Sequence, residues 1–245
     1  EIRLSLVGSE MCIRDRIMGY RIGFDIGSTT IKAVVLDENN QICYKSYERH
    51  KAQVRQKALD KLVELKKYTK EPFKFAISGS GALGLSEQGE LPFVQEVFAS
   101  ATGVSKLYPE TDCAIELGGE DAKILFFQGS VEQRMNSTCA GGTGAFIDQM
   151  ATLLNMSLEE MNEASLNYHR LYPIASRCGV FAKTDIQPLI NQGVDKCDLC
   201  ASIFQAVVDQ TITSLAQGRK IEGNILFLGG PLYFMSGLRL SLIHI

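Results

Sequence analysis

Residues 20–36 read YRIGFDIGSTTIKAVVL and predict two strands joined by a tight turn. Apolar and polar residues alternate from Tyr20 to Ile26, which is the period of a half-buried strand. Gly27-Ser28-Thr29 supplies turn residues, and Thr30–Leu36 returns as the second strand. After a polar turn, a third run at Gln41–Glu48 completes the meander. The pattern therefore predicts a three-stranded antiparallel sheet.

The same order of elements is predicted again further along the chain. A helix at 51–68 and a short buried strand, Phe73–Ser78, follow the meander. The second cycle comprises strands at 113–117, 122–128 and 131–135 with Gly118-Gly119 between the first two, then two helices, a long helix near 195–218, a last strand at 224–228 and Gly229-Gly230. Strand, glycine turn, strand and helix thus occur twice, about 95 residues apart. The predicted fold class is a duplicated α/β architecture of two lobes, with a cleft between them where ligands bind.

The composition is that of an ordinary globular chain of 245 residues, with 45% hydrophobic and 22% charged residues. Its 25 basic and 28 acidic residues give a net charge of −3 with no basic run, which argues against nucleic acid as a partner. No window reaches the ~18 apolar residues of a membrane span. Seven cysteines at scattered spacings, without a signal peptide, predict free thiols or metal ligands in a reducing, cytoplasmic compartment.

Both ends of the chain look foreign to the pattern beside them. Residues 3–16 read RLSLVGSEMCIRDR and residues 240–245 read LSLIHI, and both resemble translated sequencing-adapter read-through. We therefore expect 1–17 and 240–245 to be non-native and exclude them from the functional argument. The remaining chain divides into a first lobe at 18–107 and a second lobe at 108–239.

Each predicted lobe carries a turn of the size that binds a phosphate. In the first, Asp25 ends a strand, where a carboxylate can hold a metal ion through water, and the N–H groups and hydroxyls of the turn can surround phosphate oxygens. In the second, ELGGEDAK at 116–123 has glycines that let the backbone approach a phosphate. Its Asp121, expected to be exposed and to pack little, can orient a metal ion or water. Either turn alone is more often a plain hairpin, but the pair, together with Gly229-Gly230, favours a nucleotide site.

Other motifs carry less weight. The pattern GxxxxGK[ST] is absent, which excludes a P-loop. GSGALG at 79–84 matches GxGxxG, but no helical pattern follows directly and no strand-end acid lies about 20 residues on. Cys197 and Cys200 have no second CxxC to complete a zinc site, and they lie on an apolar stripe of the long helix, so we interpret them as core residues. His50 and His169 are predicted to lie at the surface.

Two further cysteines lie in glycine-rich loops. MNSTCAGGTGAF at 135–146 puts Cys139 just before a helix that begins near Ala145, and a helix N-terminus stabilises thiolates. SRCGVFAK at 176–183 puts Cys178 beside glycine and arginine. Two thiolates half fill a four-ligand iron–sulfur site, and a twofold dimer would supply the other pair. Two unrelated buried thiols are the alternative.

These motifs resemble those of the BadF/BadG/BcrA/BcrD-type ATPases, which include activators of 2-hydroxyacyl-CoA dehydratases and the ATP-hydrolysing subunits of benzoyl-CoA reductase. The resemblance covers about residues 18–239. It rests on DIGSTTIKAVVLD (25–37), ELGGEDAKI (116–124), MNSTCAGGTGAF (135–146), SRCGVFAKTDI (176–186) and NILFLGGP (224–231). It implies a duplicated ribonuclease-H-like fold of the actin, chaperone and sugar-kinase type. We expect this fold to be C-terminally truncated, because the foreign tail stands where a helix usually follows the last glycine motif.

The resemblance also implies ATP and Mg²⁺ bound between two lobes and one [4Fe-4S] cluster shared by a homodimer. Electrons from a low-potential donor of the ferredoxin or flavodoxin type would pass to an acyl-CoA dehydratase or reductase partner. Cys139 and Cys178 match the cluster-ligand positions, and we expect Asp25 and Asp121 to hold Mg²⁺ and position water. The expected ATP contacts are Gly27, Ser28, Thr29, Thr30, Lys32, Gly118, Gly119, Lys123, Gly142, Gly144, Gly229 and Gly230.

The predicted function is therefore an ATP-dependent reductase activator. Two other classes share the fold: a small-molecule kinase would pass the phosphate to a hydroxyl group, and a nucleotide-gated interaction module would hydrolyse ATP without holding a cluster. The iron and acid-labile sulfide content of anaerobically purified protein separates the three classes.

Overall fold

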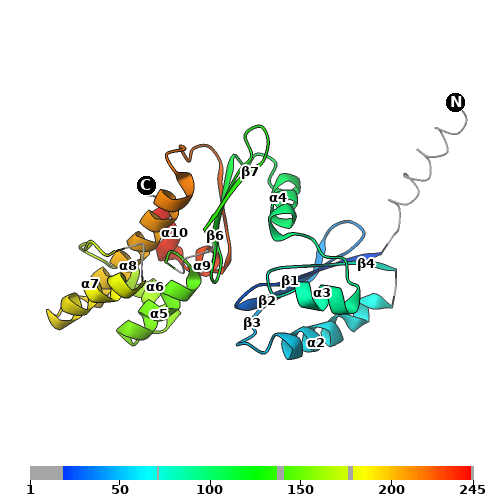
Figure 1. Ribbon diagram of the computed structural model, residues 1–245, viewed down its shortest axis with the longest axis horizontal. Helices are drawn as coiled ribbons and strands as arrows, with labels where there is room; N and C mark the ends of the chain where they lie inside the picture. The colour runs from blue at the N-terminus through cyan, green and yellow to red at the C-terminus, as the bar shows by residue number, and fades with distance from the viewer. Residues whose placement is uncertain (1–18, 71, 137–140, 176–178, 244–245) are drawn as a thin grey trace, which may run out of the picture. The chain divides into compact units, whose positions relative to one another are not determined.

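The computed structural model describes residues 19–70, 72–136, 141–175 and 179–243 (Figure 1). The chain divides into two compact units, and the division falls between Ala99 and Ser100, within helix α4 (Glu96–Leu107). The described residues form two four-stranded sheets, one in each unit.

The first unit is built on the predicted meander. Strands β1 (Tyr20–Ile26), β2 (Thr30–Leu36) and β3 (Ile42–Arg49) pair antiparallel, and β4 (Phe73–Ser78) lies parallel to β1 on its other side. The resulting strand order is β3-β2-β1-β4. Between β3 and β4 lie α2 (Val54–Leu65) and the short 3₁₀ helix η1 (Lys66–Thr69), and α3 (Leu83–Gly89) follows β4.

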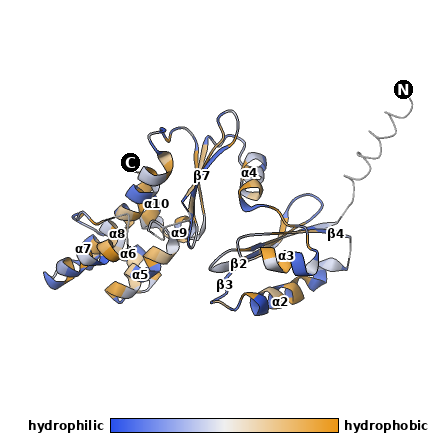
Figure 2. Cartoon of the chain, in the orientation of Figure 1, coloured by the Kyte–Doolittle hydropathy of each residue, from blue (hydrophilic) through white to orange (hydrophobic). Residues whose placement is uncertain are grey.

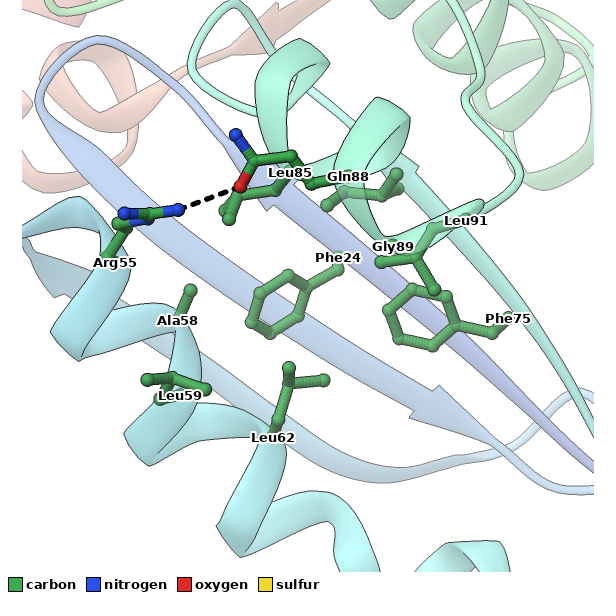
Figure 3. Close-up of a pocket in the computed structure, with 11 residues that line it drawn as sticks. Phe24, Arg55, Ala58, Leu59, Leu62, Phe75, Leu85, Gln88, Gly89 and Leu91 are labelled. Atoms are coloured by element: carbon green, nitrogen blue, oxygen red, sulfur yellow. Dashed lines mark hydrogen bonds between the residues drawn. The ribbon is translucent and has the colours of Figure 1, made fainter.

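One face of this first sheet carries the apolar core. Phe24 and Ile77 are buried there, as the alternation of the strands requires. Helix α2 alternates hydrophobic and hydrophilic residues, as Figure 2 shows, and it packs together with α3 over this face. Between the two helices and the sheet lies an apolar cavity of about 470 Å³, into which Phe24 and Phe75 point from the strands (Figure 3). Arg55 of α2 donates a hydrogen bond of 2.8 Å to the Gln88 side chain of α3 at its rim.

The second unit repeats the arrangement of strands. Strands β5 (Cys113–Leu117), β6 (Ala122–Phe126) and β7 (Glu132–Asn136) form the meander, and β8 (Ile225–Leu228) lies parallel to β5, which gives the order β7-β6-β5-β8. The helices are α5 (Gly144–Leu154), α6 (Leu158–Ser165), α7 (Gly179–Asn191), α8 (Lys196–Thr211) with its π-helical continuation η2 (Ile212–Ala216), α9 (Gly230–Phe234) and α10 (Ser236–Ile243). Ser157 and Glu160 form the predicted capping box of α6.

Helix α8 is the centre of the second core. Cys200, Phe204 and Val207 on its predicted stripe are fully buried, whereas Cys197 is only half-buried. Among the described residues, Lys196–Ala216 is a helix with the length and apolar composition of a membrane span, but 72% of that window is buried inside the protein. Its apolar surface is therefore used in packing this unit.

The two units share one local construction at the end of their parallel strands. Gly79 follows β4 with φ +100°, and Gly229 follows β8 with φ +89°. A Cβ on Gly79 would lie 2.3 Å from the carbonyl oxygen of Ile26, the last residue of β1, and a Cβ on Gly229 would lie 2.0 Å from that of Leu117, the last residue of β5. The predicted duplication therefore extends to single backbone contacts.

Two expectations about helices are wrong. Helix α3 begins at Leu83, inside the GSGALG segment, although the sequence predicts no helical pattern directly after this segment. It forms because Leu85 packs on the core of the first unit and the Ser86 hydroxyl bonds to the Leu91 carbonyl oxygen. The sequence analysis also expected the helix after the last glycine motif to be missing. Helices α9 and α10 follow that motif, and α10 buries Leu238 and Leu242 in the second core.

We predict that Gly79→Ala and Gly229→Ala each lower the free energy of unfolding by about 2 kcal/mol or more, because both positions combine a positive φ with a carbonyl oxygen inside contact distance. Gly103→Ala in α4 is the matched control, since a Cβ there meets nothing within 4 Å. Removing that helical glycine should raise stability by up to about 1 kcal/mol. Urea unfolding of the three variants measures the difference, and equal stabilities would contradict the packing argument.

Candidate functional site

The first candidate turn is closed by its own backbone. The N–H of Gly27 donates to the carbonyl oxygen of Thr30 at 2.9 Å. Just before the turn, Asp25 and Lys32 are cross-strand partners, and the Lys32 ammonium lies 2.6 Å from Asp25 Oδ2 with both side chains about one-third exposed. The predicted residues of this motif, from Asp25 to Lys32, are thus gathered at one end of the β1–β2 hairpin.

Part of the Asp25 carboxylate is left without a partner. Its Oδ1 atom is buried and accepts no hydrogen bond from any residue that the structure describes, and the same is true of the neighbouring Ser78 hydroxyl. Asp25 and Ser78 are register partners on the parallel strands β1 and β4, so their side chains leave the sheet on the same face. A buried carboxylate oxygen beside a hydroxyl suits a hydrated cation or a bound water.

Two amides of the turn are also open to a ligand. Ser28 is exposed and Thr29 half-buried, and within the described chain neither backbone N–H has an acceptor. Backbone N–H groups that project from a tight turn form an anion-binding concavity. The turn therefore offers donors for phosphate oxygens next to a carboxylate that can hold a cation.

His50 supports this turn, although the sequence analysis predicted a surface residue. Its ring is buried, with 5% of the residue exposed. The imidazole Nε2 lies 3.1 Å from the carbonyl oxygen of Gly27, and the His50 backbone N–H donates to the carbonyl oxygen of Thr29 at 3.2 Å. The surface prediction is wrong because it rested on the polar residues beside His50 in the sequence, whereas the ring is buried against the carbonyl oxygen of Gly27.

The second candidate turn has the same backbone hydrogen bond and strand register as the first, but its side-chain contacts differ. The N–H of Gly118 donates to the carbonyl oxygen of Asp121 at 2.8 Å, and Glu116 and Lys123 are cross-strand partners as Asp25 and Lys32 are in the first unit. Lys123 is 1% exposed, and its ammonium lies 2.9 Å from Asp121 Oδ2 and 3.8 Å from Glu116 Oε1. Asp121 therefore neutralises a buried lysine, and the expectation that it packs little is wrong.

Three glycine segments meet behind this second turn. The first two N–H groups of α5 donate to it: Gly144 to the carbonyl oxygen of Gly118 at 3.0 Å, and Ala145 to that of Gly119 at 2.7 Å. A Cβ on Gly144 would lie 3.2 Å from Pro231, the second residue of α9. The predicted residues Gly118, Gly119, Gly144, Gly229 and Gly230 thus lie together, and Gly142 precedes them with φ +79°. Because the Gly144 N–H is already bonded, Gly144 contributes close packing here.

The cysteine predictions have different outcomes. Cys139 and Cys178 lie outside the described residues. Within the described residues no group of three or more histidine, cysteine, aspartate or glutamate side chains is arranged to hold a metal ion.

Burial raises the pKa of the Cys200 thiol to about 12, and burial together with Asp195 also raises the pKa of Cys197. Both thiols stay protonated at neutral pH, and Cys200 Sγ packs 3.8 Å from Met156 Sδ, so the interpretation of Cys200 as a core residue is confirmed.

The sequence pattern of the BadF/BadG/BcrA/BcrD ATPase family matches residues 22–235. The chain belongs to this family. That match runs from the first β-strand to α9 and includes both candidate turns, so the resemblance found from the motifs is confirmed.

Two of the similar proteins belong to dehydratase systems. The activator of lactoyl-CoA dehydratase from Anaerotignum propionicum is 30% identical over 86% of this chain and 83% of its own length. Component A of (R)-2-hydroxyglutaryl-CoA dehydratase from Acidaminococcus fermentans superimposes with a TM-score of 0.82 and 27% identity, over 92% of this chain and 88% of that one.

A solved relative also holds a nucleotide analogue. The activator of 2-hydroxyisocaproyl-CoA dehydratase from Clostridium difficile, with bound ADPNP, superimposes with a TM-score of 0.81 and 28% identity over 92% of this chain and 85% of that one. The fold of this protein is accordingly that of the actin-like ATPases, as the sequence predicted.

Proposed function

We propose that this protein hydrolyses ATP to activate a 2-hydroxyacyl-CoA dehydratase or a benzoyl-CoA reductase-like enzyme, by delivering low-potential electrons to it. The observation that carries the proposal is the duplicated hairpin, in which each strand end bears a carboxylate, a cross-strand lysine and a tight turn. Membership of an ATPase family and the activator relatives support the same role.

In this proposal the first turn binds phosphate oxygens through the free amides of Ser28 and Thr29 and the Lys32 ammonium. The second turn contributes the backbone of Gly118 and Gly119. Lys123 is fully buried between two carboxylates, so we propose that it acts through the position of Asp121 and makes no direct phosphate contact. Gly229 and Gly230 are proposed to border the adenosine. The remaining predicted contacts, Thr30, Gly142 and Gly144, would maintain the backbone conformation at the two turns.

Asp25 is the stronger candidate for the Mg²⁺ site. Its buried Oδ1 has no partner among the described residues, which fits a cation held through water, whereas Asp121 is occupied by Lys123. Bound Mg²⁺ would supply charge neutralisation at the phosphates. Asp25 would orient its water shell, and Lys32 would hold the carboxylate by its other oxygen, 2.6 Å away.

The redox part of the proposal rests on Cys139 and Cys178. We propose that these residues of two chains hold one [4Fe-4S] cluster in a homodimer, since two thiolates per chain supply half of the four ligands that such a cluster needs. The bound cluster would supply one-electron chemistry. A ferredoxin- or flavodoxin-type donor and a cytoplasmic location complete the proposal, and the burial of the apolar helix Lys196–Ala216 supports a soluble protein.

We predict that Asp25→Asn lowers ATP turnover by about 10²-fold or more, because the variant loses the charge that orients the cation. Its stability should fall by less than about 1 kcal/mol, since the lost ion pair with Lys32 is one-third exposed. Asp37→Asn is the matched control: Asp37 binds the N–H groups of Asn39 and Gln41 at the other end of β2. Phosphate release assays measure the three proteins, and wild-type turnover in Asp25→Asn would exclude Asp25 from the site.

The cluster proposal makes a prediction about stoichiometry. Anaerobically purified protein should hold about four iron atoms per dimer. Cys139→Ala or Cys178→Ala should lose all of the iron and weaken the dimer, because each change removes two of the four ligands at once. Cys43→Ser, a change at an exposed cysteine, should keep both properties. Iron analysis with sedimentation tests this, and a monomeric wild type that carries a full cluster would refute the shared site.

A further inference from the structure

We propose that His50 is a positioning residue that holds the first turn in its phosphate-binding shape through a neutral imidazole with the proton on Nε2. The inference rests on the proposed function, in which this turn binds the phosphates of ATP. It assigns a role to a buried histidine that lies outside the five motifs on which the family resemblance rests.

The contacts of the ring fix its tautomer. The backbone N–H of Ala52 donates to His50 Nδ1 at 3.2 Å, so Nδ1 carries a lone pair and no proton. The proton of the neutral ring is then on Nε2, which donates to the carbonyl oxygen of Gly27 at 3.1 Å. The imidazole therefore connects the start of the β3–α2 loop to the first residue of the turn.

This bond sets the direction of a phosphate donor. The peptide unit is planar and trans, so its C=O and N–H groups point in opposite directions. Because the Gly27 carbonyl points toward the His50 ring, the N–H of Ser28 in the same peptide points away from it, out of the turn. A second contact, from the His50 backbone N–H to the carbonyl oxygen of Thr29, holds the other end of the turn.

The loop after His50 is bent to make these contacts. Lys51 and Ala52 are consecutive non-glycine residues with φ of +47° and +62°, a left-handed conformation that costs about 1–2 kcal/mol per residue. The bend returns the Ala52 N–H to the imidazole and the Gln53 N–H to the His50 carbonyl oxygen at 2.8 Å, one residue before α2 begins. A strained loop whose hydrogen bonds converge on one buried residue is consistent with a positioning role.

Two substitutions distinguish the role of the ring Nδ1 as an acceptor from the role of Nε2 as a donor. His50→Asn keeps an acceptor at the place of Nδ1 and loses the donor to Gly27, whereas His50→Gln can return a donor at the place of Nε2. We expect His50→Asn to weaken MgADPNP binding and raise the KM for ATP by about 5–10-fold, the value of one hydrogen bond, with a smaller change in kcat. His50→Gln should stay within about twofold of wild type.

The control is His169→Asn, at an exposed histidine of the second unit, which should leave binding unchanged. Isothermal calorimetry with MgADPNP and steady-state ATPase kinetics measure the four proteins. Binding by wild type together with unchanged affinity in His50→Asn overturns the His50 role and leaves the proposed function standing. Absence of binding by wild type overturns both. If His50→Asn does not fold, a loss of affinity in folded His50→Gln overturns the inference and retained affinity supports it.

Discussion

The construction of each unit depends on the contact between a left-handed glycine and the carbonyl oxygen that ends the neighbouring strand. Gly79 lies over the carbonyl of Ile26, and Gly229 over that of Leu117, with no room for a Cβ in either place. The contact brings the end of a parallel strand against a β-hairpin turn. In the first unit it also brings Gly79 close to the Asp25 carboxylate, since a Cβ there would lie 2.5 Å from Oδ1. The turn and the strand end thus form one small polar site.

The two units share this backbone arrangement but differ in how the acidic and lysine side chains at the turn are paired. The first keeps its acid partly available: Asp25 shares one oxygen with Lys32 and leaves the other without a partner among the described residues. The second buries its lysine between Glu116 and Asp121. Burial of an ammonium without a paired carboxylate is costly, so these acids stabilise the turn that they border. This difference supports the proposal that the first half binds the cation and that the acids of the second half have a mainly structural role.

Much of the arrangement of strands and turns could be predicted from the sequence, because strand alternation and glycine turns are local signals. The bounds of β4 and β5 agree with the prediction, and the stripe of α8 predicted its burial. The role of His50 could not be predicted, because its partners Gly27 and Thr29 lie far away in the sequence and meet it only across a sheet edge. The burial of Lys123 could not be predicted either, because a lysine in a strand is ordinarily exposed. The ligand roles of Cys139 and Cys178 stay predictions from their motifs.

In the proposed function, both hairpin turns contact the nucleotide. Amide hydrogen exchange, compared with and without MgADPNP, tests it most directly, because the N–H groups of Ser28, Thr29, Gly119 and Glu120 bond to no other described residue. The account predicts that the nucleotide slows exchange in the segments 27–30 and 118–121 together. Slowed exchange in only one of these segments, with tight binding established separately, would contradict it.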